Sequence, residues 1–555
     1  MPTDRPRRAS HAGRLARLSA ALDWRNAVGI VDILRQPADD ARGLDEQGRL
    51  RSGRLKGLSM AAAIWVLSWP ILVESALNAL VGLTDTLLTS EMDSVEGAAS
   101  AVQAVDAISA ASFIMWFIGL AIMALGTGAT AIISRSIGKG RTGVANAALG
   151  QCLLLCVIIG ALVGGIVALS TLFLPDLMGL EGEGAEAFRA YMLIIAAFVP
   201  TAGILFGGIA CARGAGDSVR PLWAMIARNI VNIIASWALS GVDISIAATA
   251  TDGEIMRTVL LENPFGFDMG IVGIALGTVL GDCVGAAIIL WMAFSGTWGI
   301  RLKLRRLRPH WHTARRLIRL GLPNYAETMG MWAGNFMVVF MVGHIAIRDA
   351  AGEVLSNAGT LGSHMWAIRI EALSFLPGFS MGIAAATLAG QYLGAGSPRH
   401  AIRAVIICAA IASTIMGLIG VALILFPHEI TRALTPVPEH LRQVPPLLYV
   451  CGFIQVPFAL AIVFRQALRG VGDVRVVMGL TWFTTYGVRL PAAYLVSGVR
   501  IPLPDGTELP NPLGELMGWD PSLTRMWIAM CGELIIRGIV FTVRFGQGTW
   551  TKLEV

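Results

Sequence analysis

The apolar and polar positions of this chain separate into long blocks. Apolar runs, each divided from the next by a short polar turn, include residues 151–174, 191–210 and 401–426. A run of about 20 apolar residues can cross the hydrocarbon core of a bilayer as a helix. We count about twelve such runs, six before and six after a polar stretch at residues 299–319. The pattern predicts an all-α polytopic membrane protein with about twelve transmembrane helices.

Three short motifs occur twice, in the same order. Pro70 and Glu74 recur 253 residues later as Pro323 and Glu327. The motif RGAGD recurs as RGVGD after 256 residues, and SIGKG recurs as YLGAG after the same interval. These offsets indicate two homologous halves. Because each half has an even number of spans, both enter the membrane from the same side. We therefore expect two six-helix lobes related by a pseudo-two-fold axis along the membrane normal, with a cleft between them.

The polar stretches divide the chain into five parts. The first part is arginine-rich, and residues 15–34 form either an amphipathic helix on the membrane surface or a disordered tail. Long outer loops at about residues 242–269 and 498–524 either restrict the outer mouth or are tolerated insertions. The expected parts are a cytoplasmic polar segment at 1–56, an N-terminal lobe at 57–298, a basic cytoplasmic linker at 299–319, a C-terminal lobe at 320–547 and a cytoplasmic tail at 548–555.

Charge is scarce and unevenly placed. Charged residues make up 14% of the chain, against about 25% in a typical soluble protein. Lysines and arginines gather in the linker and in the turn after the second span, whereas the turns after the first and third spans are acidic. This alternation follows the positive-inside rule with both termini in the cytoplasm. We expect a protein of a bacterial-type cytoplasmic (inner) membrane, whose basic runs contact anionic lipid rather than nucleic acid.

The cysteines and the missing ligand motifs limit the expected chemistry. All seven cysteines lie in or at the ends of apolar runs, their number is odd, and no metal-ligand spacing is present. The sequence also lacks a nucleotide-binding loop, a paired histidine–glutamate metal motif and a nucleophile–base pair. We expect no disulfide, no cofactor and no enzymatic activity.

Several motifs are similar to those of one transporter family. The first span reads PILVESALNALVGLTDT from Pro70, the eighth reads HMWAIRIEALSFLPGFSMGIAAATLAGQYLGAG from His364, and ALRGVGD is followed by VRLPAAYLV. In this order they resemble the multidrug and toxic compound extrusion (MATE) family of cation-coupled antiporters, over about residues 60–545. The resemblance implies alternating access, export of organic cations or drug-like amphiphiles, and an ion-linked aspartate at Asp85 within GLTDT.

Two carboxylates share one face of the first span. Glu74 and Asp85 are eleven residues apart, which at about 100° per residue leaves them about 20° apart around the helix, and Asn78 lies one turn after Glu74. A carboxylate inside a bilayer costs at least ~2.5 kcal/mol, so this stripe should face the interior or the cleft. Each group could instead be structural. Asp85 has Val338 as its counterpart, whereas Glu74 has Glu327. We therefore expect the first lobe alone to handle the coupling ion.

Further candidate ion ligands lie on the fifth and sixth spans. Asn229, Asn232 and Ser236 occupy one helical face. The resemblance implies Asn, Asn and Asp at this spacing, so Ser236 departs from the family. Thr278 matches a family threonine, and Asp282, one turn beyond it, is our own candidate for the missing carboxylate. Sodium needs several hard oxygen ligands, whereas a proton needs one buried carboxylate. The departure favours proton coupling, with sodium at Asp85 as the alternative.

Polar and polarizable residues are candidates for a substrate cleft, and ordinary helix packing is the alternative for each of them. Arg369 and Glu371 match an RIE pattern of the family, and Arg489 matches an RLP pattern. We interpret all three as packing or gating groups, with Arg489 bonding freed backbone carbonyls or a carboxylate. Asp106 receives no role. The cleft candidates are Asn78, Glu327, Met329, Trp332, Asn335 and Met365.

The sequence thus predicts a secondary active antiporter that exports organic cations or drug-like amphiphiles in exchange for protons. We expect it to act as a monomer, with a small molecule and membrane lipid as its partners. A flippase for a lipid-linked precursor is the alternative, because such transporters resemble MATE proteins in architecture. A flippase cleft would need cationic lining, and the predicted spans hold few arginines or lysines, which argues against it. A non-transporting sensor also stays open.

Overall fold

The structure is a computed structural model of the 555-residue chain. Most of the segment 15–34, for which an amphipathic helix and a disordered tail are the alternatives, lies outside the described part, and its last residues belong to the short helix α2 (Ile30–Arg35). The side chain of Asp106 lies outside the described part. The structure describes every residue except 1–28, 36–40, 93–100, 178–179, 181, 250–254, 346, 349–353, 357–358, 436, 503–507 and 554–555.

Six long helices form the first lobe. A helix bonds all its backbone groups internally, as an apolar segment inside a membrane must. Ser59 begins the first of them by accepting a hydrogen bond from the backbone of Ala62. Gly241 and Gly296, both with left-handed backbone, end the last two. The helices are α3 (Met60–Ser90), α4 (Ala101–Gly138), α5 (Thr142–Ser170), α7 (Gly182–Gly214), α8 (Val219–Ser240) and α9 (Gly270–Ser295), with the short α6 (Leu174–Leu177) before α7.

The second lobe has six spans, two of which are interrupted. One is a pair of helices bent by 61°, and the other contains a π-helical stretch. The interrupted spans are α14 (Pro438–Phe453) with α15 (Gln455–Gly470), and α16 (Val474–Trp482) with η4 (Phe483–Arg489) and α17 (Leu490–Ser497). The other four are α10 (Trp311–Gly343), α11 (Thr360–Gly394), α12 (Pro398–Leu425) and α19 (Leu523–Gly546), and the short α13 (Pro427–Leu434) follows α12.

Length and composition support the predicted membrane architecture. In the described part, nine single helices are long and apolar enough to cross a membrane, and the bent pair α14–α15 makes a tenth span. The remaining two spans are α10, whose first turns are basic, and the interrupted segment α16–η4–α17. The predicted fold class, an all-α protein with six spans in each of two lobes, is confirmed.

Small antiparallel hairpins occur in the long loops between spans, where the sequence predicts no strands. The first long loop contains β1 (Ile244–Thr249) paired with β2 (Ile255–Leu261). The second contains β5 (Ile501–Pro502) paired with β6 (Glu508–Leu509), followed by the one-turn helix α18 (Pro512–Met517). A further pair, β3 (Ile347–Arg348) with β4 (Val354–Ser356), lies between α10 and α11.

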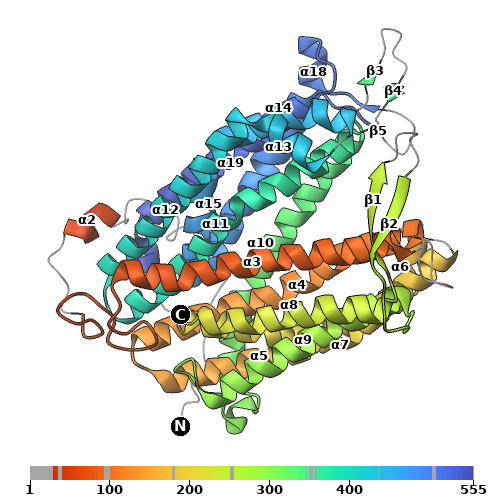
Figure 1. Cartoon of the computed structure of the whole chain (residues 1–555). Coiled ribbons are helices and arrows are strands. Elements are labelled where there is room, and N and C mark those ends of the chain that lie inside the picture. The colour runs from red at the N-terminus through yellow and green to blue at the C-terminus, as the bar shows by residue number, and fades with distance from the viewer. Residues whose placement is uncertain are drawn as a thin grey trace, which may run out of the picture.

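The two lobes meet at one end and diverge toward the end that carries the hairpins (Figure 1). Residues of two of the three repeated motifs, SIGKG/YLGAG and RG–GD, lie where the lobes meet. Thr387 and Gln391 of α11 donate to the backbone oxygens of Arg213 and Gly214 in α7, both at 3.2 Å. A Cβ atom on Gly138 of α4 would overlap the carbonyl group of Gln391. The glycines of these motifs therefore allow the helices of the two lobes to touch.

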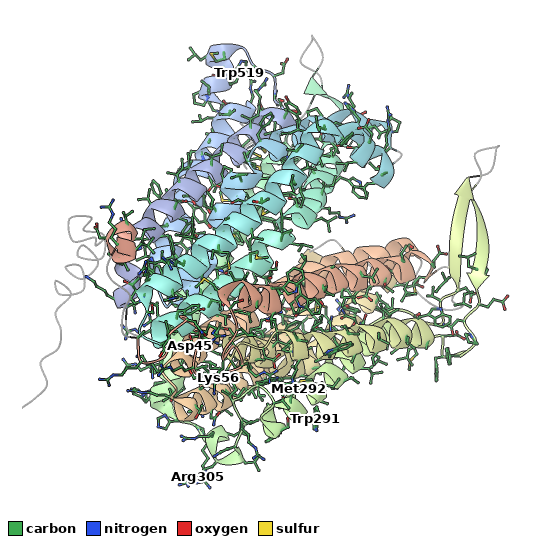
Figure 2. The ribbon with its side chains drawn as sticks, turned by 60° about the vertical axis from the view of Figure 1, so that its left-hand side comes forward. Asp45, Lys56, Trp291, Met292, Arg305 and Trp519 are labelled. Carbon is green, nitrogen blue, oxygen red and sulfur yellow. The ribbon has the colours of Figure 1, made fainter. Side chains whose placement is uncertain are left out.

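Residues 41–58, which we call the N-terminal strap, bridge the lobes at the same end. The backbone N–H of Gly43 donates to Ala395 O in the second lobe at 3.3 Å. Ser52 Oγ donates to Ile137 O in the first lobe at 2.6 Å. Figure 2 shows Asp45 and Lys56 of the strap where the lobes meet, whereas Trp519 lies at the far end of the second lobe. The strap is therefore part of the contact between the lobes.

The strap is an ordered segment that buries its leucines against the second lobe. Leu44, Leu50 and Leu55 are each less than 10% exposed and belong to the core of the second lobe. The backbone N–H of Arg49 donates to Asp45 Oδ1 at 2.8 Å, and its guanidinium donates to Oδ2 at 2.9 Å. These bonds hold the pKa of Asp45 below its usual value.

The basic linker is attached to the first lobe. It contains the 3₁₀ turn η3 (Leu304–Leu307). Gln151 of α5 donates to the backbone oxygens of Arg306 and Arg308 at 2.8 Å and accepts from the N–H of His310 at 2.9 Å. Three bonds to one buried side chain fix the linker to α5.

Helix α10 belongs to both lobes. Leu317, in its first half, is fully buried in the core that α4, α5, α7 and α9 form. Val338 and Val342, in its second half, are buried in the core of the second lobe. Pro323 lies between the two halves.

Candidate functional site

In both lobes, the glutamate of the repeated Pro–Glu motif binds the arginine of the repeated RG–GD motif. Arg213 Nη2 lies 2.5 Å from Glu74 Oε2, and Arg469 Nη2 lies 2.6 Å from Glu327 Oε2. Each ion pair joins the first helix of its lobe to the fourth span, α3 to α7 and α10 to α15. The only trace of this pairing in the sequence is that both partners recur at nearly the same offset.

Arg228 of α8 lies among the predicted ion ligands. Its Nε lies 2.8 Å from Asp282 Oδ1. Its Nη1 donates to Asn229 Oδ1 at 3.0 Å and to Asn78 Oδ1 at 3.5 Å. One guanidinium therefore uses oxygens of two predicted ion ligands, Asp282 and Asn229, and of the cleft candidate Asn78. This arrangement opposes the idea that Asp282 replaces the missing carboxylate of a sodium site.

Asp85 differs from the other acidic candidates of the first lobe. Among the described residues it makes no ion pair, and its Oδ1 is buried without a hydrogen-bond partner. Arg228 is the cation whose charge acts on it. An unpaired buried carboxylate oxygen is unfavourable, so a proton or a cation would be stabilised there.

The predicted polar face of α8 packs against α9. Asn232 Nδ2 donates to Thr278 Oγ1 at 3.0 Å, and Ser236 Oγ lies 3.4 Å from Ile274 O. Asn232 and Ser236 are fully buried. Asn232 Oδ1 and Asn229 Nδ2 are buried without a partner within the described residues. The structure thus leaves two acceptor oxygens of the predicted set unused, Asn232 Oδ1 and Asp85 Oδ1.

The second lobe holds a larger network of buried charges, with Glu533 at one of its two centres. Arg489 donates to Glu533 Oε2 from Nε at 3.0 Å and from Nη2 at 2.8 Å. Arg537 donates to Glu533 Oε1 at 2.7 Å and to Thr485 Oγ1 at 2.9 Å. Arg489 also donates to Asn335 Oδ1 at 2.8 Å. Arg489 therefore binds a carboxylate, one of its two predicted kinds of partner.

Glu327 is the second centre of this network. Thr481 Oγ1 donates to Glu327 Oε1 at 2.8 Å, in addition to the ion pair with Arg469. Arg465 Nη1 lies 3.8 Å from the same Oε1 and donates to Met331 Sδ at 3.4 Å. The side chains of Glu327 and Glu533 are fully buried.

These contacts correct the expectation that the spans hold few basic residues. Single charges within apolar runs were the available signal, and they mark functional positions in membrane proteins. The argument against a flippase that rested on this expectation therefore fails. Among the described residues, the arginines with buried or nearly buried ion pairs inside the spans are Arg213, Arg228, Arg465, Arg469, Arg489, Arg537 and Arg544.

The structure divides the predicted cleft residues between the lobes. Asn78 contacts Arg228 in the first lobe, whereas Glu327 and Asn335 belong to the charge network of the second. Met329 and Trp332 are half-buried on α10, and Met365 is 37% exposed near the start of α11. The six predicted residues therefore come from both lobes, and their common role in a cleft stays a prediction.

The gating candidates Arg369 and Glu371 have different environments. Arg369 lies over the ring of Trp366, at 5.3 Å from its centroid. The half-buried carboxylate of Glu371 makes no hydrogen bond that the described residues account for, and Arg489 is the cation whose charge acts on it. With Glu327 and Glu533, Glu371 is thus the third carboxylate in or near the network of buried charges in the second lobe. The described residues contain no cluster of three or more histidine, cysteine or acidic side chains that could hold a metal.

Two homologous helical lobes, with charged groups paired inside apolar spans, define a polytopic membrane transporter. The profile of the MatE family matches residues 70–238 and 323–495, which together cover more than half of the chain. The chain belongs to the MatE family, whose members are transporters and not enzymes.

Relatives and solved structures agree with this assignment. The chain is 24% identical over 490 residues to a probable multidrug resistance protein NorM of Thermotoga maritima, covering 88% of this chain and 93% of the relative. It is 27% identical over 219 residues to the multidrug resistance protein PmpM of Pseudomonas aeruginosa, covering 39% and 43%. An outward-facing structure of a MATE multidrug resistance transporter superposes with a TM-score of 0.73 at 18% identity, covering 94% of this chain and all of that one.

Proposed function

We propose that this protein is a secondary active antiporter that exports organic cations or drug-like amphiphiles by alternating access, in exchange for protons. The names of its relatives refer to multidrug resistance, which supports export of small molecules over transport of a lipid-linked precursor. The distribution of basic residues supports insertion into a bacterial-type cytoplasmic membrane with both termini inside. In that orientation the lobes meet at the cytoplasmic end and diverge toward the outside.

The unpartnered, buried oxygen of Asp85 is the observation that carries the proposal. An ionised Asp85 attracts an organic cation, and a protonated Asp85 does not. A proton and a cationic substrate therefore compete for the same carboxylate, and the coupling between two such ligands is reciprocal. Protons entering from outside would displace the substrate outward.

Arg228 supports protons over sodium as the coupling ion. Its guanidinium binds the side-chain oxygens of Asp282, Asn229 and Asn78, so those oxygens already serve a positive group. A sodium ion at Asp85 would compete with Arg228 for ligands and would add a second positive charge in a low-dielectric region. A proton needs only Asp85 itself.

Transport in proteoliposomes tests the proposal. Purified protein is reconstituted, a cationic dye such as ethidium is added, and a pH gradient or a sodium gradient is imposed separately. We expect dye movement under the pH gradient alone. Movement under the sodium gradient alone would refute proton coupling, and no movement under either gradient would refute antiport of cations.

A further inference from the structure

The buried network of the second lobe contains more positive than negative charge. Four arginines lie within it, namely Arg465, Arg469, Arg489 and Arg537, and the carboxylates that bind them are Glu327 and Glu533. Glu371 raises the number of nearby carboxylates to three. One positive charge therefore stays uncompensated, even if all three carboxylates are ionised.

Arg465 is the arginine with the weakest partners. Its closest carboxylate oxygen, Glu327 Oε1, lies 3.8 Å away, while Arg469 lies at 2.6 Å from the other oxygen of that glutamate. The Nε of Arg465 is buried without a hydrogen-bond partner among the residues that the structure describes. The charges that act on Arg465 come from Glu327 and Glu533, and they are opposed by Arg469 and Arg537.

Two of these guanidiniums share a poor acceptor. Arg465 Nη1 lies 3.4 Å, and Arg537 Nη1 lies 3.7 Å, from the sulfur of Met331. A thioether sulfur accepts hydrogen bonds only weakly. Met331 follows Asn78 by 253 residues, so it occupies the repeat position at which the first lobe offers an amide oxygen to Arg228. The second lobe thus has apolar sulfur where its counterpart has a polar oxygen.

Arg465 is also not completely enclosed, because its side chain is 16% exposed. An arginine with spare donors is not stable against hydrocarbon, so its exposed part should face the space between the lobes rather than lipid. A planar guanidinium with free N–H groups matches the two oxygens of a carboxylate.

We propose that Arg465 forms an anion subsite that binds the carboxylate of a zwitterionic amphiphile, whose cationic group is held by Asp85 in the first lobe. This inference deepens the proposed function, on which it rests, by naming the substrate class. The two lobes then recognise opposite ends of one molecule. A purely cationic amphiphile leaves Arg465 unpaired and binds more weakly.

Equilibrium binding to the full-length protein in detergent tests the subsite without any gradient. The probes are a rhodamine with a free carboxylate and the methyl ester of the same dye, measured by fluorescence polarisation. We expect the wild type to bind the acid more tightly than the ester. In Arg465→Gln, the affinity for the acid should fall by roughly 10-fold or more, while the affinity for the ester stays unchanged. Arg442→Gln, whose side chain is 67% exposed, is the matched control.

Met331→Gln keeps the test decisive if Arg465→Gln does not fold. The amide oxygen of the new glutamine would accept hydrogen bonds from Arg465 and Arg537 in place of a ligand, as Asn78 accepts one from Arg228. We expect this variant to fold with an unchanged or higher thermal midpoint and to bind the acid more weakly than the wild type does.

Several results would overturn the inference. Equal binding of the acid and the ester by the wild type would do so, as would an equal loss for both dyes in Arg465→Gln. If inorganic phosphate alone stabilised the protein through Arg465 while the dyes bound equally, the subsite would take a free anion and the proposal would be wrong. Proton-driven transport of the ester without any preference for the acid would refute the subsite and leave the proposed antiport intact.

Discussion

The two lobes have the same scaffold but different centres. Each joins its first helix to its fourth span through one glutamate and one arginine, Glu74 with Arg213 and Glu327 with Arg469. Among the described residues, the first lobe then keeps a buried carboxylate oxygen without a partner, Asp85 Oδ1, whereas the second keeps an excess of arginine. The duplicated ion pair maintains helix packing, and the residues that differ between the halves are the ones available for function.

The largest effect is expected from Asp85→Asn. The variant keeps the size and polarity of the side chain but cannot ionise, so proton-coupled dye movement should fall to the rate of empty liposomes. Expression and the thermal midpoint should stay close to those of the wild type. Asp176→Asn, at a side chain that is 73% exposed, is the control. A wild-type transport rate in Asp85→Asn would remove the proposed difference between the lobes.

Substitution of the duplicated glutamates should distinguish the lobes by stability. Glu327→Gln leaves Arg469 and Arg465 without a counter-charge in a fully buried site, and we expect a loss of about 3–5 kcal/mol. Glu74→Gln affects one arginine at a slightly more exposed site, and we expect about 1.5–3 kcal/mol. Thermal unfolding followed by tryptophan fluorescence ranks the two variants. A lower midpoint for Glu74→Gln than for Glu327→Gln would contradict the comparison.

The aspartates of the RG–GD motifs offer a second, smaller contrast. Arg544 donates to Asp473 Oδ2 from both Nε and Nη2, at 3.0 and 2.8 Å, and both side chains are 6% exposed. Arg544→Ala should therefore cost about 3 kcal/mol, because it leaves a buried carboxylate unpaired. The same thermal assay measures it, and an unchanged midpoint would show that Asp473 finds another partner.

The smallest effect is expected from Arg54→Ala in the N-terminal strap, which removes a contact with Asp217 of the first lobe. Arg54 Nε lies 3.4 Å from Asp217 Oδ2, but its side chain is 43% exposed, and Arg220 binds the same oxygen at 2.9 Å. Water screens such a pair, so we expect a loss of about 0–1 kcal/mol. A loss as large as that of Arg544→Ala would mean that the strap contributes more to stability than its exposure indicates.

The sequence predicted the fold well because length and apolarity decide where a helix crosses a membrane. The repeat also predicted the equivalence of Glu74 and Glu327. Their arginine partners, by contrast, lie 139 and 142 positions away in the chain, and only the packing of α7 and α15 brings them together. For the same reason, spacing along α8 could not reveal that Arg228 binds the predicted ligands.

The N-terminal strap and the hairpins were beyond sequence reasoning for a different reason. The hydrogen bonds of the strap to the lobes are single contacts to backbone atoms, such as Ser52 to Ile137 O, and these leave no periodic pattern. The strands β1 and β2 are six and seven residues long, and their weak alternation lies inside a loop between two strong helical signals.

Helix α10 has a mechanical consequence, because its two halves are anchored in different bodies. Any change in the angle between the two lobes must therefore bend or twist helix α10. Pro323 lacks an N–H group, so the helix is weakest there. Glu327 lies one turn further on, in contact with Arg469 and within 4 Å of Arg465. Bending at the proline would therefore change how tightly Glu327 holds these arginines. The binding of the arginines in the second lobe is thus coupled to the angle between the two lobes.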